Sequence, residues 1–90
     1  MNISLRQMRA FAAVTQYGSF TGAARQLSLT QSAVSMLVQQ LEQELRLQLF
    51  DRSRTSITLT EAGMNLLPQA QRILEDVRQV VEGASEIRAL

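Results

Sequence analysis

The sequence predicts a mainly α-helical fold with three short helices, a small two-stranded hairpin and a long final helix. Apolar residues recur at intervals of three and four along most of the chain, which is the period of an amphipathic helix. Between residues 49 and 59 this period gives way to short alternating stretches, which are typical of strands. The 90 residues suffice for one small domain, so a partner chain or a neighbouring domain is expected to share its packing.

The first helix is predicted from its two ends and from an apolar stripe. Ser4 has a side-chain oxygen suited to an N-cap, and Gly18 tolerates the left-handed backbone that often ends a helix. The stripe consists of Leu5, Met8, Phe11, Ala12 and Val14. We expect this stripe to face the core.

Residues 20–39 predict two helices joined by a tight turn. The second helix begins near Phe20 or Thr21, and Thr30 is placed to cap the third. Helices that cross steeply over a short turn need small residues at the contact and apolar residues beside it. The small residues are Ala24 and Ser28, and the apolar ones are Leu27, Leu29, Val34 and Leu37. Leu41 and Leu45 extend the apolar face of the third helix. This spacing favours a helix-turn-helix, and an ordinary helical hairpin is the alternative.

The remaining elements are a hairpin and a last helix. Residues 49–52 and 57–59 read as two short strands around a polar turn, so residues 49–59 form the predicted wing. Thr60 is placed to cap a helix that runs over residues 61–90. Pro68 removes one backbone donor and is expected to bend that helix.

The third helix carries a polar face opposite its apolar one. At 100° per residue this face consists of Ser32, Ser35, Met36, Gln39 and Gln43, and Gln31 lies beside the N-terminus of the helix. Glutamine can bond the edge of adenine in a major groove, serine can serve several bases, and methionine can contact a thymine methyl. Residues 26–41 hold no charge, which is unusual for a helix face that is only solvated. The pattern therefore favours base reading over a plain solvated surface.

Charge is divided unevenly along the chain. Residues 1–60 hold six arginines and three acids, a net +3, whereas residues 61–90 hold three arginines and five acids, a net −2. Only the first part favours a polyanion. Arg52 and Arg54 on the hairpin could lie along phosphates or in a minor groove. The alternative is two solvated arginines, one of them paired with Asp51.

The last helix predicts a dimerisation seam. Its apolar residues follow one another at alternating steps of four and three, which is a heptad repeat. They are Leu66, Ala70, Ile73, Val77, Val80, Ala84 and Ile87. Packing of this stripe on the chain's own helices is the alternative, but those helices have only a small core to offer.

Several classes of function are disfavoured by residues that the sequence lacks. Without cysteine there are no disulfides or thiolate metal sites, and without histidine there is no ready base at neutral pH. We therefore expect no catalytic residues, no metal and no cofactor. No apolar run approaches the roughly 20 residues that span a bilayer, so a cytoplasmic protein without membrane contact is expected.

The ordered motifs together resemble the signature of LysR-type transcriptional regulators over essentially the whole chain. These motifs are Leu5-Arg6-Gln7-Met8-Arg9-Ala10-Phe11, Gly18-Ser19-Phe20-Thr21-Gly22-Ala23-Ala24, Leu27, Thr30-Gln31-Ser32-Ala33-Val34-Ser35, Leu41-Glu42, Glu44-Leu45, Leu49-Phe50-Asp51-Arg52 and Leu59-Thr60-Glu61-Ala62-Gly63.

The resemblance implies a winged helix-turn-helix DNA-binding domain over residues 1–60 and a linker or dimerisation helix over 61–90. It also implies a C-terminal domain that binds a small-molecule effector and is absent from this chain, in a tetramer built as two dimers. The expected function is a transcription factor that reads a partly symmetric operator in double-stranded DNA as a homodimer, with antiparallel final helices. A helical dimerisation or adaptor module that binds protein is the alternative.

The resemblance also assigns roles to residues at matching positions. Gln31, Ser32, Ser35 and Met36 would read bases, Thr21 and Thr30 would touch the DNA backbone, and Arg52 with Arg54 would make the wing contact. The chain departs from the family pattern at three positions. Ser32 replaces a frequent proline, Met36 replaces an arginine or another polar residue, and Arg46 replaces a helix-ending glycine. If the backbone at Arg46 is left-handed, the cost is about 1 kcal/mol.

Overall fold

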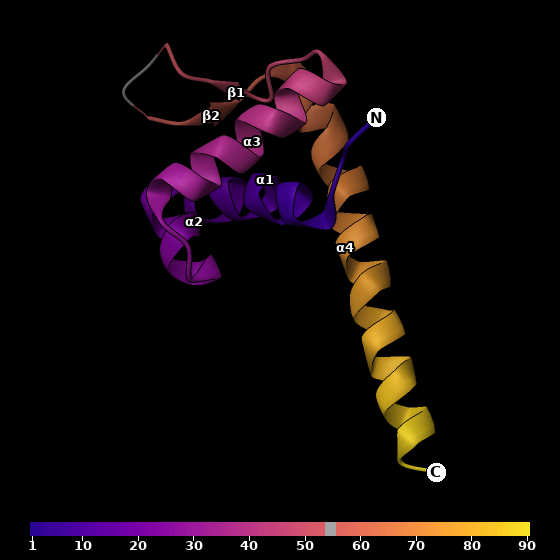
Figure 1. The fold of residues 1–90 in the computed structure, drawn as a ribbon. Coiled ribbons are helices and arrows are strands. Elements are labelled where there is room, and N and C mark those ends of the chain that lie inside the picture. Colours follow the sequence, from indigo (N-terminus) through magenta and orange to yellow (C-terminus); the bar gives the residue numbers. More distant parts are fainter. Residues whose placement is uncertain (54–55) are drawn as a thin grey trace.

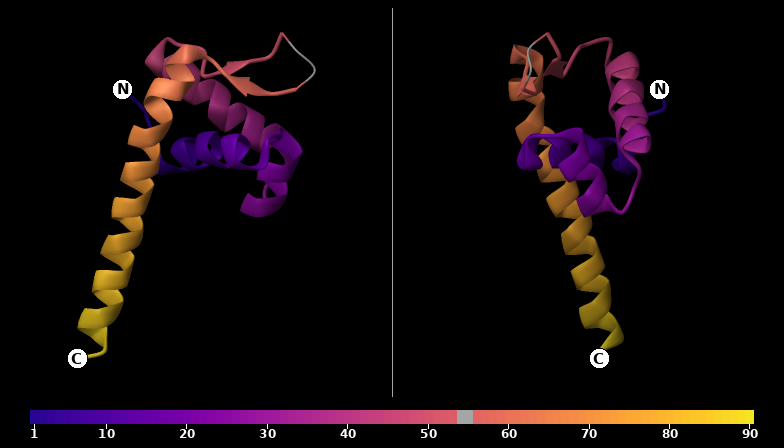
Figure 2. Two further views of the ribbon diagram at one scale, coloured as in Figure 1. Left: turned by 180° about the vertical axis from the view of Figure 1, so that it is seen from behind. Right: turned by 90° about the vertical axis from the view of Figure 1, so that its left-hand side faces the viewer.

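A computed structural model describes residues 1–53 and 56–90 and confirms the predicted mainly helical fold with a two-stranded wing. Its elements are α1 (Leu5–Tyr17), α2 (Phe20–Leu27), α3 (Gln31–Leu45), β1 (Phe50–Asp51), β2 (Thr58–Leu59) and α4 (Glu61–Arg88). The first three helices pack into a body, and α4 projects well beyond it (Figure 1). Views from behind and from the side show the same elongated shape, which extends over 53 × 25 × 20 Å (Figure 2).

Each helix begins at a side-chain cap, and three of these caps were predicted. Ser4, Thr30 and Thr60 accept hydrogen bonds from backbone N–H groups three residues later, at 3.0–3.1 Å. The Gln7 side chain accepts a hydrogen bond from the Ser4 backbone N–H and so completes a capping box. Ser19 caps α2 in the same way and was not anticipated.

Three helices end in a left-handed residue. Gly18 does so with a φ of 70°, as predicted, and Ser28 and Arg46 do so with φ values of 57° and 58°. At the end of α3 the Leu47 N–H donates to the Glu42 carbonyl over 3.1 Å, which closes the last turn. Arg46 therefore has a left-handed backbone, as was expected because it stands where the family often has a helix-ending glycine.

Replacing Arg46 with glycine is expected to raise the free energy of unfolding by about 1 kcal/mol, because glycine adopts the left-handed region without steric cost. Urea unfolding followed by circular dichroism measures the change. Gly18→Ala is the matched control and should have the opposite sign, since it places a Cβ on a left-handed backbone. Equal stability of Arg46→Gly and the original chain would show that the left-handed turn stores no strain.

The core lies where α1 crosses α3 beneath the wing. Its largest fully buried side chains are Phe11, Val14, Val34, Val38 and Leu49. The ring of Phe50 on β1 packs edge-on against Phe11 and Phe20, with centroids 5.6 and 6.0 Å apart. The wing is thus anchored in the core by its first strand.

The apolar stripe predicted for α1 is partly wrong, and the stripe predicted for α3 is confirmed but incomplete. On α1, Leu5 is exposed while Ala10 and Ala13 are buried. On α3, Val38 is fully buried while Leu37 is only half-buried. The reason is that α1 contacts α2, α3 and α4. Its buried face is therefore wider than a single stripe, and small alanines permit the close approach.

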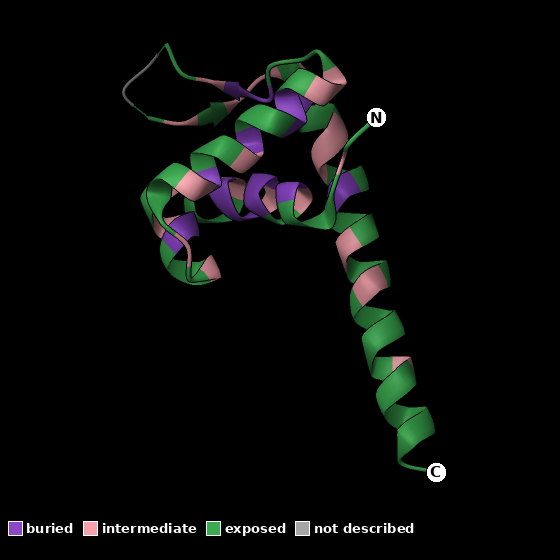
Figure 3. Cartoon of the chain, in the orientation of Figure 1, coloured by how far each residue is buried: buried purple, intermediate pink, exposed green. Residues whose placement is uncertain are grey.

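Only the first turns of α4 join the core. Leu66 and Leu67 pack against it and Ala70 is buried, but Val80 and Ile87 are each 71% exposed. The change from buried to exposed along α4 is visible in Figure 3. From Val80 onward the apolar stripe therefore does not pack back on the chain's own helices. Pro68 lies inside α4 without ending it, and the bend expected there stays a prediction.

None of the described helices is long and apolar enough to cross a membrane. Among the residues that the structure describes, no group of three or more acidic side chains is arranged to hold a metal ion.

Candidate nucleic-acid interface

The structure brings the five predicted base-reading residues together on the exposed face of α3. Gln31, Ser32, Ser35, Met36 and Gln39 are all exposed and line one shallow depression. Met36 is 57% exposed. The face therefore combines amide and hydroxyl groups with one apolar patch.

The start of α2 lies beside the start of α3. The Thr21 hydroxyl donates a hydrogen bond to Gln31 Oε1 over 3.4 Å, a long bond between two exposed side chains. This bond uses the carbonyl oxygen of the Gln31 amide. Thr30 accepts the bond from the Ala33 N–H and still has a hydroxyl hydrogen to donate. Both threonines thus lie at the entrance of the α3 face, where a DNA backbone contact was predicted.

The polar surface of α3 continues toward the wing. Ser35 and Gln39 also line a second depression. Its other lining residues are Glu42, Gln43, Arg46, Leu47, Gln48 and Arg52. The polar face of α3 and the base of the wing therefore form one continuous surface.

The wing itself is a short antiparallel pair. Phe50 is opposite Leu59 and Asp51 is opposite Thr58, so each strand is shorter than the sequence indicated. The Ser53 N–H and hydroxyl both donate to Asp51 Oδ1, at 2.9 and 2.5 Å, and begin the turn. Arg54, the second predicted wing contact, lies outside the described residues.

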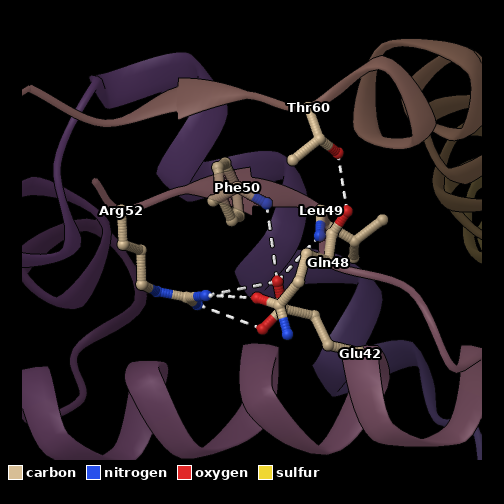
Figure 4. Close-up of polar contacts among 6 residues, drawn as sticks. All are labelled: Glu42, Gln48, Leu49, Phe50, Arg52 and Thr60. Atoms are coloured by element: carbon tan, nitrogen blue, oxygen red, sulfur yellow. Dashed lines mark hydrogen bonds and ion pairs between the residues drawn. The ribbon is translucent and has the colours of Figure 1, made fainter. Parts of the chain in front are cut away.

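Arg52 is held by Glu42 at the base of the wing (Figure 4). Its Nη2 lies 3.1 Å from Glu42 Oε1, and its Nη1 donates to Glu42 Oε2 over 3.3 Å and to Gln48 Oε1 over 3.1 Å. The guanidinium carbon also lies 5.6 Å from the centre of the Phe20 ring. The contact of Arg52 with DNA stays a prediction. In the structure the Arg52 side chain has partners within the chain, namely Glu42, Gln48 and Phe20.

Glu42 is the residue of this surface that sequence reasoning missed. Its side chain is only 4% exposed, and its Oε2 accepts the backbone N–H of Leu49 over 2.8 Å. Glu42 follows the buried Val38 by one helical turn and so lies beside the core face of α3. An acidic residue at such a position is the sequence signal that could have identified it. A buried carboxylate requires several donors, so its presence there implies a network.

Comparison with known proteins agrees with this arrangement. Residues 5–64 match the family described as "Bacterial regulatory helix-turn-helix protein, lysR family". The RuBisCO operon transcriptional regulator of Allochromatium vinosum is 41% identical over 90 residues, which are 100% of this chain and 30% of that protein. The HTH-type transcriptional regulator CfxR of Cupriavidus necator is 44% identical over 86 residues, which are 96% of this chain and 27% of that protein.

Solved structures show the same fold. The DNA-binding domain of BenM in complex with catB site 1 DNA has a TM-score of 0.88 at 36% identity, over 93% of this chain and 94% of that one. Full-length OxyR C199D of Pseudomonas aeruginosa has a TM-score of 0.90 at 30% identity, over 94% of this chain and 29% of that one.

These relatives are transcriptional regulators, which confirms that the chain does not belong to a family of enzymes. The chain spans less than a third of the length of the two curated relatives described above. Its helix-turn-helix, wing and projecting helix, together with the match over residues 5–64, place it in the LysR family of bacterial regulatory proteins.

Proposed function

We propose that this chain binds double-stranded DNA sequence-specifically, with α3 in the major groove. The observation that carries the proposal is the exposed, uncharged face of Gln31, Ser32, Ser35, Met36 and Gln39 beside the wing. The likeness to a domain solved in a DNA complex supports it. A helix with such a face fits a major groove, where amides and hydroxyls meet base edges.

Each part of this surface has a proposed role. Gln31 and Ser35 bond base edges, and Met36 contacts a thymine methyl. Thr21 and Thr30 touch the sugar-phosphate backbone, which sets the register of α3 without reading sequence. Arg54 contacts the DNA backbone or the adjacent minor groove, as predicted from the sequence. The protein-binding adaptor is the weaker candidate, because the related domain was solved on DNA.

A homodimer through α4 completes the proposal. Toward the end of α4, the apolar side chains of Val80, Val81 and Ile87 are exposed in the described chain. Arg78 bridges Glu75 and Glu82 away from this stripe, and its guanidinium lowers the pKa of the Glu75 carboxyl. One side of the helix is thus charged while the other side is apolar, as in a paired helix.

A hollow at the root of α4 lies on the same apolar side. It is lined by Ile3, Met8, Phe11, Leu41, Leu45, Leu66, Gln69, Ala70 and Ile73. An antiparallel partner helix would bring its distal end close to this hollow. The tetramer, the small-molecule effector and its C-terminal domain remain proposals for the longer protein, as does its place in the cytoplasm with the DNA.

Replacing Gln31 with alanine tests base reading. We expect a loss of roughly 1–3 kcal/mol on a duplex that the chain selects from a random library, and a much smaller loss on unrelated duplex. Fluorescence anisotropy on both duplexes measures the difference. Gln16→Ala, an exposed glutamine on α1, is the control and should change neither affinity. Equal losses on both duplexes would show that Gln31 positions the protein without reading sequence.

A further inference from the structure

We propose that Glu42 is a positioning residue that holds the wing against the reading helix, and that Arg52 acts through Glu42 without neutralising a phosphate. The inference rests on the proposed DNA binding and refines the part played by the wing.

The Glu42 carboxylate joins α3 to the segment that holds Leu49, Phe50 and Arg52. Oε2 accepts the N–H of Leu49 over 2.8 Å, the N–H of Phe50 over 3.4 Å and Nη1 of Arg52 over 3.3 Å. Oε1 lies 3.1 Å from Nη2 of Arg52. A carboxylate that is 4% exposed costs free energy unless it is paired and hydrogen-bonded, and here both oxygens have partners. The network is therefore consistent only with one placement of β1 relative to α3.

The segment between α3 and β1 is closed from its other side as well. The Thr60 hydroxyl donates to the Gln48 carbonyl over 2.6 Å, and the Thr60 N–H donates to the Leu49 carbonyl over 3.0 Å. Figure 4 shows the bond of the Thr60 hydroxyl beside the contacts of Glu42. The start of α4 and the end of α3 thus both form hydrogen bonds to the short segment of Gln48 and Leu49. Movement of the wing relative to α3 requires breaking bonds to Glu42.

The two terminal nitrogens of the Arg52 guanidinium face Glu42. Nη1 and Nη2 both meet Glu42, Nη1 also meets Gln48, and the flat face covers Phe20. A bidentate arginine–carboxylate pair is a strong and directional contact. These contacts engage three of the five guanidinium hydrogens, and the Glu42 carboxylate already offsets the charge that a phosphate would meet. Lysine carries the same charge but lacks the fork, so it can replace a phosphate contact and cannot replace this one.

The test compares Arg52→Lys, Arg52→Gln and Glu42→Gln on the selected duplex over a series of salt concentrations. We expect each to lose about tenfold in affinity, with the salt slope of the original chain, and the Glu42→Gln/Arg52→Gln pair to be no worse than either single change. Arg72→Gln, an exposed arginine on α4, is the control for loss of charge. Circular dichroism shows whether each variant is folded under the binding conditions.

Two results would overturn the proposal. If Arg52→Lys binds as the original chain does while Arg52→Gln flattens the salt slope by about one unit, Arg52 contacts a phosphate. If a folded Glu42→Gln variant binds normally, the wing does not depend on Glu42. Should Glu42→Gln not fold, the Arg52→Lys result decides alone. Failure of the original chain to distinguish duplexes would instead reject the proposed function.

Discussion

The Gly63→Ala variant is expected to lose about 3 kcal/mol of unfolding free energy, because a core position with no free space tolerates added volume poorly. A Cβ at Gly63 would lie 2.2 Å from the Leu49 carbonyl oxygen and 2.9 Å from Leu59 Cδ2. The first contact is with backbone, which cannot turn aside as a side chain can. The start of α4 would have to move away from β2 and from the residue that precedes β1. Chemical denaturation measures the loss, which is a large share of the 5–15 kcal/mol that holds a typical domain together.

Gly83→Ala is the matched control on the same helix. A Cβ at Gly83 meets nothing within 4 Å in this chain, so alanine should stabilise α4 by about 1 kcal/mol through helix propensity. Both variants are compared at a concentration that gives them the same oligomeric state. A Gly63→Ala variant as stable as the original chain would mean that α4 does not press against the wing.

The Ile73→Glu/Val77→Glu double variant is expected to be a folded monomer that binds a two-half-site duplex on the order of 100-fold more weakly. Ile73 is exposed and Val77 is half-buried in the single chain, so the charges mainly affect a partner helix. Sedimentation velocity gives the oligomeric state, and anisotropy gives the affinity.

Gln71→Glu/Gln79→Glu adds the same charge to exposed positions outside the seam and should remain a dimer. A dimeric Ile73→Glu/Val77→Glu variant with normal affinity for the full duplex would place the dimer contact elsewhere.

The features that could be predicted from the sequence depend on neighbours along the chain. The caps at Ser4, Thr30 and Thr60 are bonds to residues three positions away, so their local pattern sufficed. The exposed face of α3 followed from the helical period, since charge was missing from it and apolar residues lay opposite. The left-handed backbone at Arg46 followed from the glycine expected at that position.

The features that could not be predicted depend on contacts between distant segments. Glu42 and Arg52 are ten residues apart and meet because the wing folds back on α3. The buried face of α1 also differs from its stripe, because contacts with three other helices decide it. Periodicity locates one face of a helix but does not say how many neighbours it has.

The central claim is that this chain recognises a particular duplex sequence, and one measurement tests it most directly. The affinity for the selected duplex and for a scrambled duplex of the same composition is measured over a range of salt concentrations. We predict that log affinity falls linearly with log salt for both, and that the selected duplex binds at least about 1,000-fold more tightly. Equal affinity for the two duplexes, or no affinity for either, would contradict sequence-specific recognition by α3.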